Sequence, residues 1–147
     1  MRLNALLCLF TVWIIATAFA LSQAQPNQQN GPKASTAKPS KVVIEGLVRD
    51  IACAIQNPEA TATDFNLQCA VACARHGSPL IVQTRGGMLY IPISDSMPDT
   101  DQRQKLMPFV GKFVRVRGIV YERNGTRAIV ISELNEMKNV HLTTDAQ

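Results

Sequence analysis

The sequence predicts a small, mainly β protein whose five strands close into a barrel, and three observations lead to this prediction. Five segments rich in β-branched residues follow one another between Lys41 and Met137. Two helical segments interrupt them, one after the first strand and one after the third. Two of the strands carry a central glycine, Gly46 and Gly118, and these glycines suit the sharply coiled strands that a small barrel requires.

The first three strands are expected in the first half of the domain. Residues 41–51 (KVVIEGLVRDI) alternate between apolar and polar side chains, which places Val48 on one face and Arg49 on the other. Residues 79–84 (PLIVQT) and 88–93 (MLYIPI) are joined through an Arg-Gly-Gly turn. Two short β-rich runs separated by a glycine turn predict a hairpin.

The last two strands show the clearest pattern. Residues 112–122 (KFVRVRGIVYE) place Val116 and Val120 on one face of the strand and arginines on the other. Asn124-Gly125 follows, and this dipeptide favours the type I′ turn of a tight hairpin. Residues 126–134 (TRAIVISEL) are expected to pair back along the preceding strand.

The two helices complete the order of elements. The first is expected from about Phe65 to Gly77, with Thr63 or Asp64 as its cap. The second covers residues 102–107 (QRQKLM), after an Asp cap and before Pro108. Five strands with a helix between the third and fourth is the order of an OB-fold barrel. An SH3-like barrel or an open five-stranded sheet would produce the same pattern.

The chain divides into four segments. Residues 1–24 have a basic start and then an apolar run, which is typical of a secretory signal peptide cleaved after Ala24 or Ala20. An uncleaved membrane anchor is the alternative. Residues 25–40 are polar and predict a flexible linker, residues 41–137 form the OB-fold-like domain, and residues 138–147 are expected to be a frayed tail. We therefore expect a periplasmic or secreted protein.

The charge of the chain argues against two classes of partner. The formal charge is +4, and removing the leader with Arg2 lowers it to +3. That surplus is too small to argue for nucleic acid or an anionic membrane surface. The arginines of the last hairpin more often form a solvated face. We expect a protein or a small ligand as partner, and a membrane only if the leader is retained.

Several short motifs occur in a fixed order: a lone cysteine after the first strand, a Cys-Ala-x-x-Cys-Ala helix, Gly-x-Pro, Leu-x-Pro-x-x-Gly and Val-x-Val-x-Gly-x-Val. Their positions are Cys53; Cys69, Ala70, Cys73 and Ala74; Gly77 and Pro79; Leu106, Pro108 and Gly111; Val114, Val116, Gly118 and Val120. With these motifs the domain resembles a group of exported bacterial OB-fold proteins of uncharacterised function. The resemblance implies export and the fold, and brings no activity. Similar proteins often have a histidine where this chain has Asn66.

The cysteines are the most distinctive residues. On a helix, Cys69, Cys73 and His76 share one face, and Cys53 lies in the same long connection. Together they would suit a Cys3His site for zinc or thiolate binding of copper. A disulfide from Cys53 to Cys69 or Cys73 is the alternative, since an exported chain meets an oxidising compartment. Cysteines packed as small apolar residues against the barrel are the third interpretation.

Enzymatic activity finds little support in the sequence. His76 lies three residues after Cys73 and would be the base for a cysteine nucleophile, but this pairing recurs by chance on helices. The recognised motifs of serine hydrolases, zinc proteases and Cys-x-x-Cys redox proteins do not occur. We expect a non-enzymatic, exported binding or interaction module, with a disulfide near its cysteine-bearing helix. The alternative is a periplasmic zinc or copper protein that uses Cys53, Cys69, Cys73 and His76.

Overall fold

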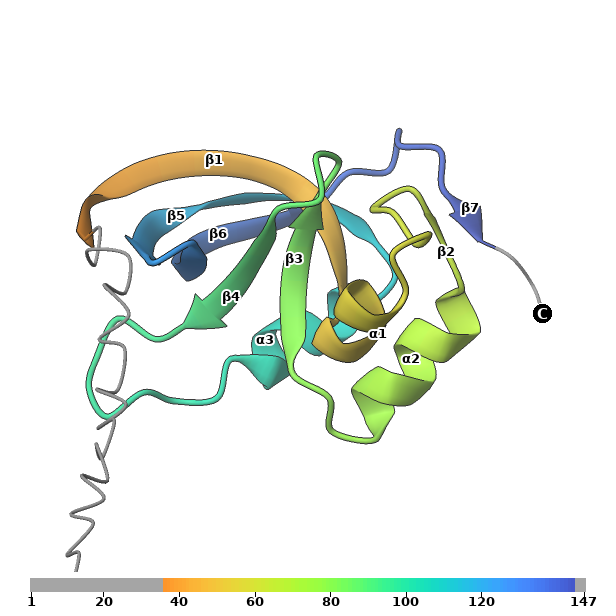
Figure 1. Cartoon of the computed structure of the whole chain (residues 1–147), viewed down its shortest axis with the longest axis horizontal. Coiled ribbons are helices and arrows are strands. Elements are labelled where there is room, and N and C mark those ends of the chain that lie inside the picture. Colours follow the sequence, from red (N-terminus) through yellow and green to blue (C-terminus); the bar gives the residue numbers. More distant parts are fainter. Residues whose placement is uncertain (1–35, 145–147) are drawn as a thin grey trace, which may run out of the picture. The chain divides into compact units, whose positions relative to one another are not determined.

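A computed structural model describes residues 36–144, in which five strands form a closed barrel (Figure 1). Around the barrel the strands follow the order β1, β3, β4, β6 and β5, after which β5 pairs with β1 again. The pair β4–β6 is parallel and the others are antiparallel. This confirms the predicted OB-fold-like barrel. The strands are β1 (Thr36–Asp50), β3 (Leu80–Thr84), β4 (Leu89–Ile93), β5 (Phe113–Arg123) and β6 (Thr126–Glu136).

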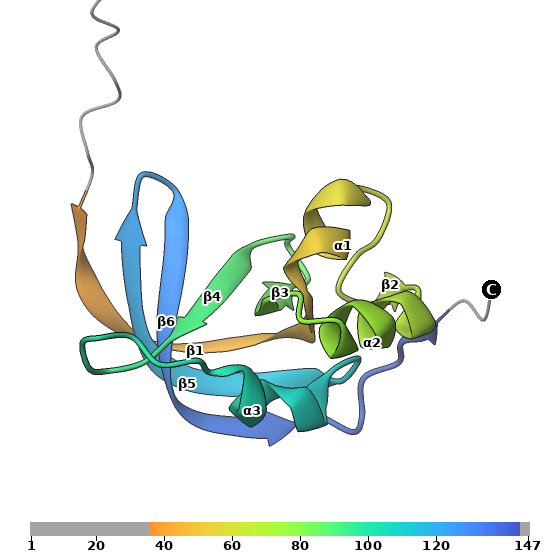
Figure 2. The same cartoon turned by 90° about the horizontal axis from the view of Figure 1, so that it is seen from below.

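The remaining elements lie mostly in two connections. Between β1 and β3 the chain forms α1 (Ile51–Gln56), the short strand β2 (Asp64–Phe65) and α2 (Leu67–Arg75). Figure 2 shows α1 and α2 next to each other at one end of the barrel. The connection between β4 and β5 contains α3 (Arg103–Leu106) and a 3-10 turn, η1 (Met107–Phe109). After the barrel, β7 (Thr143–Thr144) pairs in parallel with β2.

The interior of the barrel, which we term the first core, is built from aliphatic side chains. On β5, Val114, Val116 and Val120 are buried while Arg115 and Arg117 are exposed, as the alternation predicts. The exposed arginines pair with glutamates on neighbouring strands, for example Arg115 with Glu45 at 2.7 Å. The buried members of the first core are Ile44, Val48, Ala74, Leu80, Val82, Leu106, Val114, Val116, Val120, Ile129 and Ile131.

Two glycines allow the strands to approach each other closely. A Cβ atom on Gly46 would collide with the backbone oxygen of Gln83, and one on Gly118 with that of Val130. The ladder between β5 and β6 also shifts its register just before Gly118. Glycine at these positions therefore permits the coiling and the bulge that close a small barrel. The Asn124-Gly125 turn has positive φ at both residues, as a type I′ turn requires.

A second core lies on the outer face of the barrel. Leu47 and Phe113 are adjacent in sequence to Val48 and Val114 of the first core, so they point to the opposite face of their strands. The connection carrying β2 and α2 covers them. The buried residues of this second core are Leu47, Ala60, Ala62, Phe65, Ala70 and Phe113, and Leu67, Met137, Val140 and Leu142 pack around them.

Because of this second core, two expectations from the sequence are wrong. Arg49 was expected on the polar outer face, but it is 1% exposed because the connection covers that face. Its guanidinium lies 5.8 Å from the centre of the Phe65 ring. Residues 138–144 are not a frayed tail, since Leu142 packs on the second core and β7 pairs with β2.

The boundaries of several elements also differ from those expected. β1 begins at Thr36, so residues 36–40 of the expected linker belong to a strand that pairs with β5. β1 ends at Asp50, and α1 was not predicted. α2 begins at Leu67 and is capped by Asn66, because Phe65 is in β2. The proposed leader, residues 1–24, lies outside the described residues. Within the described part of the chain, every helix is too short or too polar to cross a membrane.

Candidate functional site

The first cysteine of the site is placed by the start of α1. The carboxylate of Asp50 accepts a hydrogen bond from the backbone N–H of Cys53 at 2.7 Å. Aspartate is a favoured residue at this position because it satisfies one of the free N–H groups at the start of a helix. The cap fixes Cys53 in the first turn of α1, directly after the end of β1.

The second helix begins in the same way. The side-chain oxygen of Asn66 accepts a hydrogen bond from the backbone N–H of Cys69 at 2.7 Å, and Cys73 follows one turn later. Ala70 and Ala74 are the buried residues of α2 and face the protein interior. The two alanines, and not the cysteines, therefore form the face of α2 that packs on the protein interior. The interpretation of the cysteines as small apolar residues packed on the barrel does not hold for Cys69, which is exposed.

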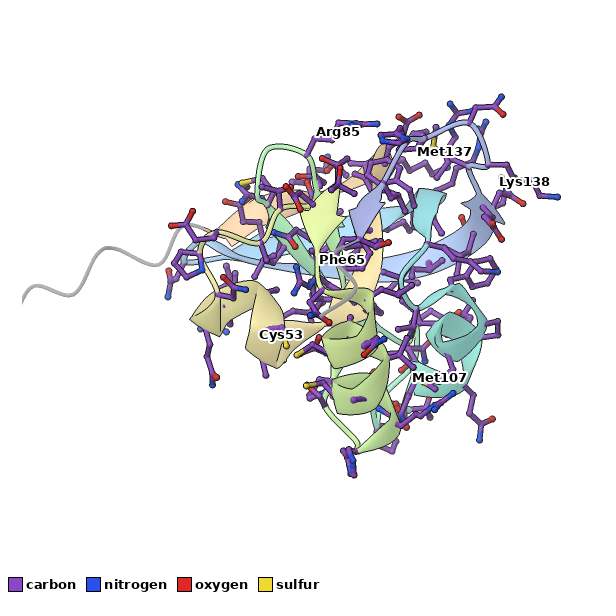
Figure 3. The ribbon with its side chains drawn as sticks, turned by 90° about the vertical axis from the view of Figure 1, so that its right-hand side faces the viewer. Cys53, Phe65, Arg85, Met107, Met137 and Lys138 are labelled. Atoms are coloured by element: carbon purple, nitrogen blue, oxygen red, sulfur yellow. The ribbon has the colours of Figure 1, made fainter. Side chains whose placement is uncertain are left out.

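The three thiols meet between the two helices. The Sγ atom of Cys53 lies 3.1 Å from that of Cys69 and 3.7 Å from that of Cys73. All three sulfur atoms are within 4.8 Å of one another. Figure 3 shows Cys53 on α1, facing the sulfur atoms of α2. The three cysteines are free in this structure, because the sulfur separations exceed the roughly 2.05 Å of a disulfide bond.

His76 does not join this group. It is the residue that ends α2, where its backbone N–H donates to the carbonyl oxygen of Ala72 at 3.0 Å. Its side chain is exposed, and the group of mutually close ligand atoms contains the three sulfurs alone among the described residues. The helical spacing of Cys73 and His76 suggested a shared face, but the exposed imidazole of His76 is not among the ligand atoms that lie close together.

The environment of Cys53 and Cys73 favours the protonated forms of these two thiols. Burial raises the pKa of Cys53 far above its ordinary value, and the neighbouring thiols and the Asp50 carboxylate add to the increase. For Cys73, the hydrogen bond with Cys53 lowers the pKa, but burial and the charge of Asp50 outweigh it and raise the pKa overall. A cation bound between the sulfurs would have to displace their protons.

Asp50 is the residue of the site that the sequence analysis did not single out. It is fully buried, and its Oδ2 atom has no hydrogen-bond partner among the described residues. Oδ1 is used as the cap of α1. A signal was present in the sequence, since Asp50 and Asn66 each stand three residues before a cysteine. Asp and Asn are favoured helix caps, so this spacing indicates a cysteine in the first turn of a helix.

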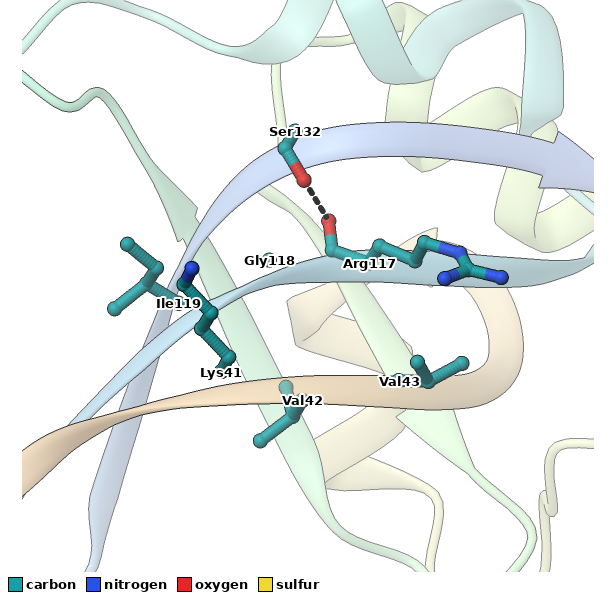
Figure 4. Close-up of a pocket in the computed structure, with 7 residues that line it drawn as sticks. All are labelled: Lys41, Val42, Val43, Arg117, Gly118, Ile119 and Ser132. Atoms are coloured by element: carbon teal, nitrogen blue, oxygen red, sulfur yellow. Dashed lines mark hydrogen bonds between the residues drawn. The ribbon is translucent and has the colours of Figure 1, made fainter.

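Two hollows of about 470 Å³ occur on the described surface. One adjoins the site, and Glu59, Asp64 and Cys69 contribute to its wall. The other lies over β1, β5 and β6 and is lined by residues of these strands, including Lys41, Val43 and Arg117 (Figure 4). Next to it, Ser132 donates a hydrogen bond to the carbonyl oxygen of Arg117 at 3.1 Å. The hollow over β1, β5 and β6 is an open strand face, whereas the hollow next to the site gives access to Cys69.

Comparison with protein-family models, curated proteins and solved structures gives no match to this chain. The resemblance to exported OB-fold proteins therefore stays a prediction, and the candidate site is defined by its own geometry.

Proposed function

We propose that this protein is a non-enzymatic metal-binding module in which Cys53, Cys69 and Cys73 hold one metal ion. The observation that carries this proposal is the convergence of three sulfur atoms within 4.8 Å of one another. A disulfide needs two of these atoms, and a third sulfur at the same point has no role in it. Thiolates from several positions around one point are the usual donors for zinc and for copper(I).

The support on which the cysteines sit fits this proposal. Cys53 and Cys69 are each in the first turn of a helix, and the cap residue of that helix holds the cysteine backbone. Ala70 and Ala74 anchor α2, so the face carrying Cys69 and Cys73 is fixed relative to α1. Donors held in this way lose little conformational freedom when an ion binds, which favours affinity.

Catalysis by a cysteine nucleophile is disfavoured by the same environment. A nucleophilic cysteine is activated when its pKa is lowered by a neighbouring cation or base. Here burial and the Asp50 carboxylate act in the opposite direction on Cys53, whose pKa is raised. His76 lies outside the group of sulfurs and is exposed.

The second candidate is a disulfide that clips the connection to the helix, as the sequence analysis proposed. The distance of 3.1 Å between the Sγ atoms of Cys53 and Cys69 favours this pair over Cys53 and Cys73, at 3.7 Å. Cys73 would then be the remaining free thiol. In the entropic model, such a bridge closing a loop of roughly 15 residues stabilises a domain by about 3 kcal/mol.

One experiment separates the two candidates. Protein purified without an affinity tag or chelator is analysed for zinc and copper, and its intact mass is measured under native and denaturing conditions, with and without reductant. Metal binding predicts one equivalent of metal, and each of Cys53→Ala, Cys69→Ala and Cys73→Ala should abolish it. A disulfide between Cys53 and Cys69 predicts no metal and a mass that rises by two hydrogens on reduction.

Cys73→Ala is the variant that discriminates best. Under the metal proposal it loses the metal, because a site built on three sulfurs is crippled by the loss of one. Under the disulfide proposal, the Cys73→Ala variant keeps the bridge between Cys53 and Cys69. Once the leader has been removed, this variant has no free thiol. His76→Ala is the matched control, since it removes a potential ligand on the same helix outside the sulfur group. Metal-free protein with one free thiol would refute the metal proposal.

We further propose that the module is exported, on the basis of the apolar leader in residues 1–24. N-terminal sequencing of the protein from its native host should begin at Gln25, or at Leu21. A start at Met1 in the membrane fraction would show instead that the leader is retained as an anchor.

The ion pairs of the β5–β6 hairpin support a partner other than nucleic acid. Arg115, Arg117 and Arg127 pair with glutamates, which leaves little unbalanced positive charge on this hairpin.

A further inference from the structure

The two helices that carry the site start alike, but their caps differ in environment. Asp50 caps α1 and Asn66 caps α2, and each accepts a hydrogen bond from the cysteine three residues on. Asn66 is neutral and half-buried. Asp50 is a carboxylic acid and is fully buried. A cap alone would be served equally well by asparagine, so capping does not explain a buried acid at this position.

Only one of the two oxygen atoms of the Asp50 carboxylate has a hydrogen-bond partner among the described residues. Oδ1 accepts from the Cys53 N–H, while Oδ2 is buried and has no hydrogen-bond partner among the described residues. A buried carboxylate oxygen without a partner is unfavourable unless a cation or a donor compensates it. Native proteins satisfy nearly all such atoms, and an exception calls for an explanation.

The neighbouring arginine does not provide that compensation. Arg49 precedes Asp50 on the strand, so the two side chains point to opposite faces. The Arg49 guanidinium lies over Phe65 in the second core and donates to the Gln83 side chain at 3.3 Å. Among the described residues, no lysine, arginine or histidine forms a salt bridge with Asp50.

The Asp50 carboxylate lies next to the first turn of α1, because its Oδ1 atom accepts the hydrogen bond from the N–H of Cys53. The charge of this carboxylate contributes to the raised pKa of the Cys53 and Cys73 thiols. The Asp50 oxygens lie outside the group of atoms within 4.8 Å of one another. Coordination of an ion by Oδ2 would require this oxygen to move toward the sulfurs, and Oδ1 is the atom that would remain for the cap.

We propose that Asp50 is the fourth ligand of the ion held by the three cysteines, so that the site is Cys3Asp and takes a divalent ion such as zinc. This inference rests on the metal-binding function proposed above. Zinc accepts carboxylate oxygen beside sulfur and is usually four-coordinate in proteins. Copper(I) prefers soft sulfur ligands and gains little from a carboxylate. A carboxylate at this position therefore directs the site toward zinc.

The test uses cobalt(II) as a spectroscopic substitute for zinc in the full chain and in Asp50→Asn. Asparagine is as good a helix cap as aspartate, so the variant should fold, and without metal it should melt no lower than the wild type, because a buried unpaired charge has been removed. We expect wild-type protein to bind one cobalt(II) with the visible absorption of a tetrahedral site and a thiolate charge-transfer band. In Asp50→Asn the cobalt(II) affinity should fall at least about tenfold, and the visible bands should shift. Copper(I) affinity, measured by competition with a chromogenic chelator, should stay unchanged.

One control variant defines the outcome. His76→Ala removes the exposed imidazole at the end of α2, and it should keep the wild-type cobalt(II) affinity. Unchanged cobalt(II) affinity and spectrum in Asp50→Asn would overturn the fourth-ligand assignment and leave the three-cysteine site intact. A loss of affinity in His76→Ala would assign the fourth position to the histidine instead. If the wild-type protein binds copper(I) but neither cobalt(II) nor zinc, the zinc assignment alone is overturned. If it binds none of the three metals, the proposed metal-binding function is refuted as well.

Discussion

The two hydrophobic cores of this protein share strands but differ in how they are closed. The first core fills the barrel with aliphatic side chains that alternate along β1 and β5. The second core covers the outer face of the same strands, and it contains Phe65, several alanines and the buried Arg49. The first is closed by the hydrogen-bonded ladder of the barrel. The second is closed by a connection and by residues that follow β6.

This difference indicates that the fold and the candidate site depend on the two cores to different degrees. The ladder of the barrel is formed by its five strands alone. The cysteines sit on α1 and α2, and α2 is anchored by Ala70 in the second core as well as by Ala74 in the first. A substitution in the first core is expected to act on the whole domain, and one in the second core mainly on the thiols.

The largest effect is expected from Val116→Asp. Val116 is fully buried in the first core, and an aspartate there would place an unpaired charge in an apolar environment. We expect the domain to be unfolded at room temperature, as measured by circular dichroism. An unchanged melting temperature would show that the inward register of β5 is wrong.

Phe65→Ala is expected to have the next largest effect. The ring is 3% exposed in the second core, and removing a buried phenylalanine typically costs about 3–5 kcal/mol. Urea unfolding would measure this loss. The rate of thiol alkylation under native conditions should also rise at Cys53 and Cys73, because α2 loses its support. Ile129→Val in the first core is the control, and it should leave the alkylation rates unchanged.

A smaller effect is expected from Leu142→Ala. Leu142 is half-buried against the second core, so its loss should cost about 1–2 kcal/mol, below the range for a fully buried leucine. Hydrogen exchange should show faster exchange at Thr143, whose N–H donates to the carbonyl oxygen of Thr63 at 2.8 Å. If exchange at Thr143 were already at the rate of an unprotected amide in the wild type, the β2–β7 pairing would be refuted.

The smallest effect is expected from Arg117→Ala. Its ion pair with Glu133 measures 3.1 Å, but both side chains are more than half exposed, and exposed pairs contribute little. The free energy of unfolding should change by less than about 0.5 kcal/mol. A larger loss would mean that the outer face of β5 contributes to stability in a way that its exposure does not indicate.

The barrel was predictable because its signals are local. Alternation on β5 identified the buried valines, and Asn124-Gly125 identified the turn that follows. The second core has no such signal. Phe65 is flanked by Asp64 and Asn66, and its partner Phe113 is the first residue of β5, whose apolar alternation concerns the opposite face. Arg49 was misplaced for the same reason, because a polar side chain on an outer face is normally solvated.

The candidate site was predictable in part. Helical spacing places Cys69 and Cys73 on one face. The structure brings Cys53 next to them, as the metal-site and the disulfide interpretations both required. Spacing also selected His76, but the helix ends at that residue. α1 escaped prediction because its six residues are too few to show a periodic pattern. Asp50 escaped with it, since a cap is recognised only when its helix is.

The pairing of β2 with β7 has a consequence for the order in which the protein is assembled. A growing chain emerges from its amino end, so the five barrel strands are available before Thr143 and Thr144 appear. Leu142 and β7 can dock on the connection only after they have emerged, so this contact is available later than the strands of the barrel. We expect the thiols to be held less firmly until then and to be open to an oxidant or an ion. The surroundings in which residues 142–144 arrive would then influence the final state of the cysteines.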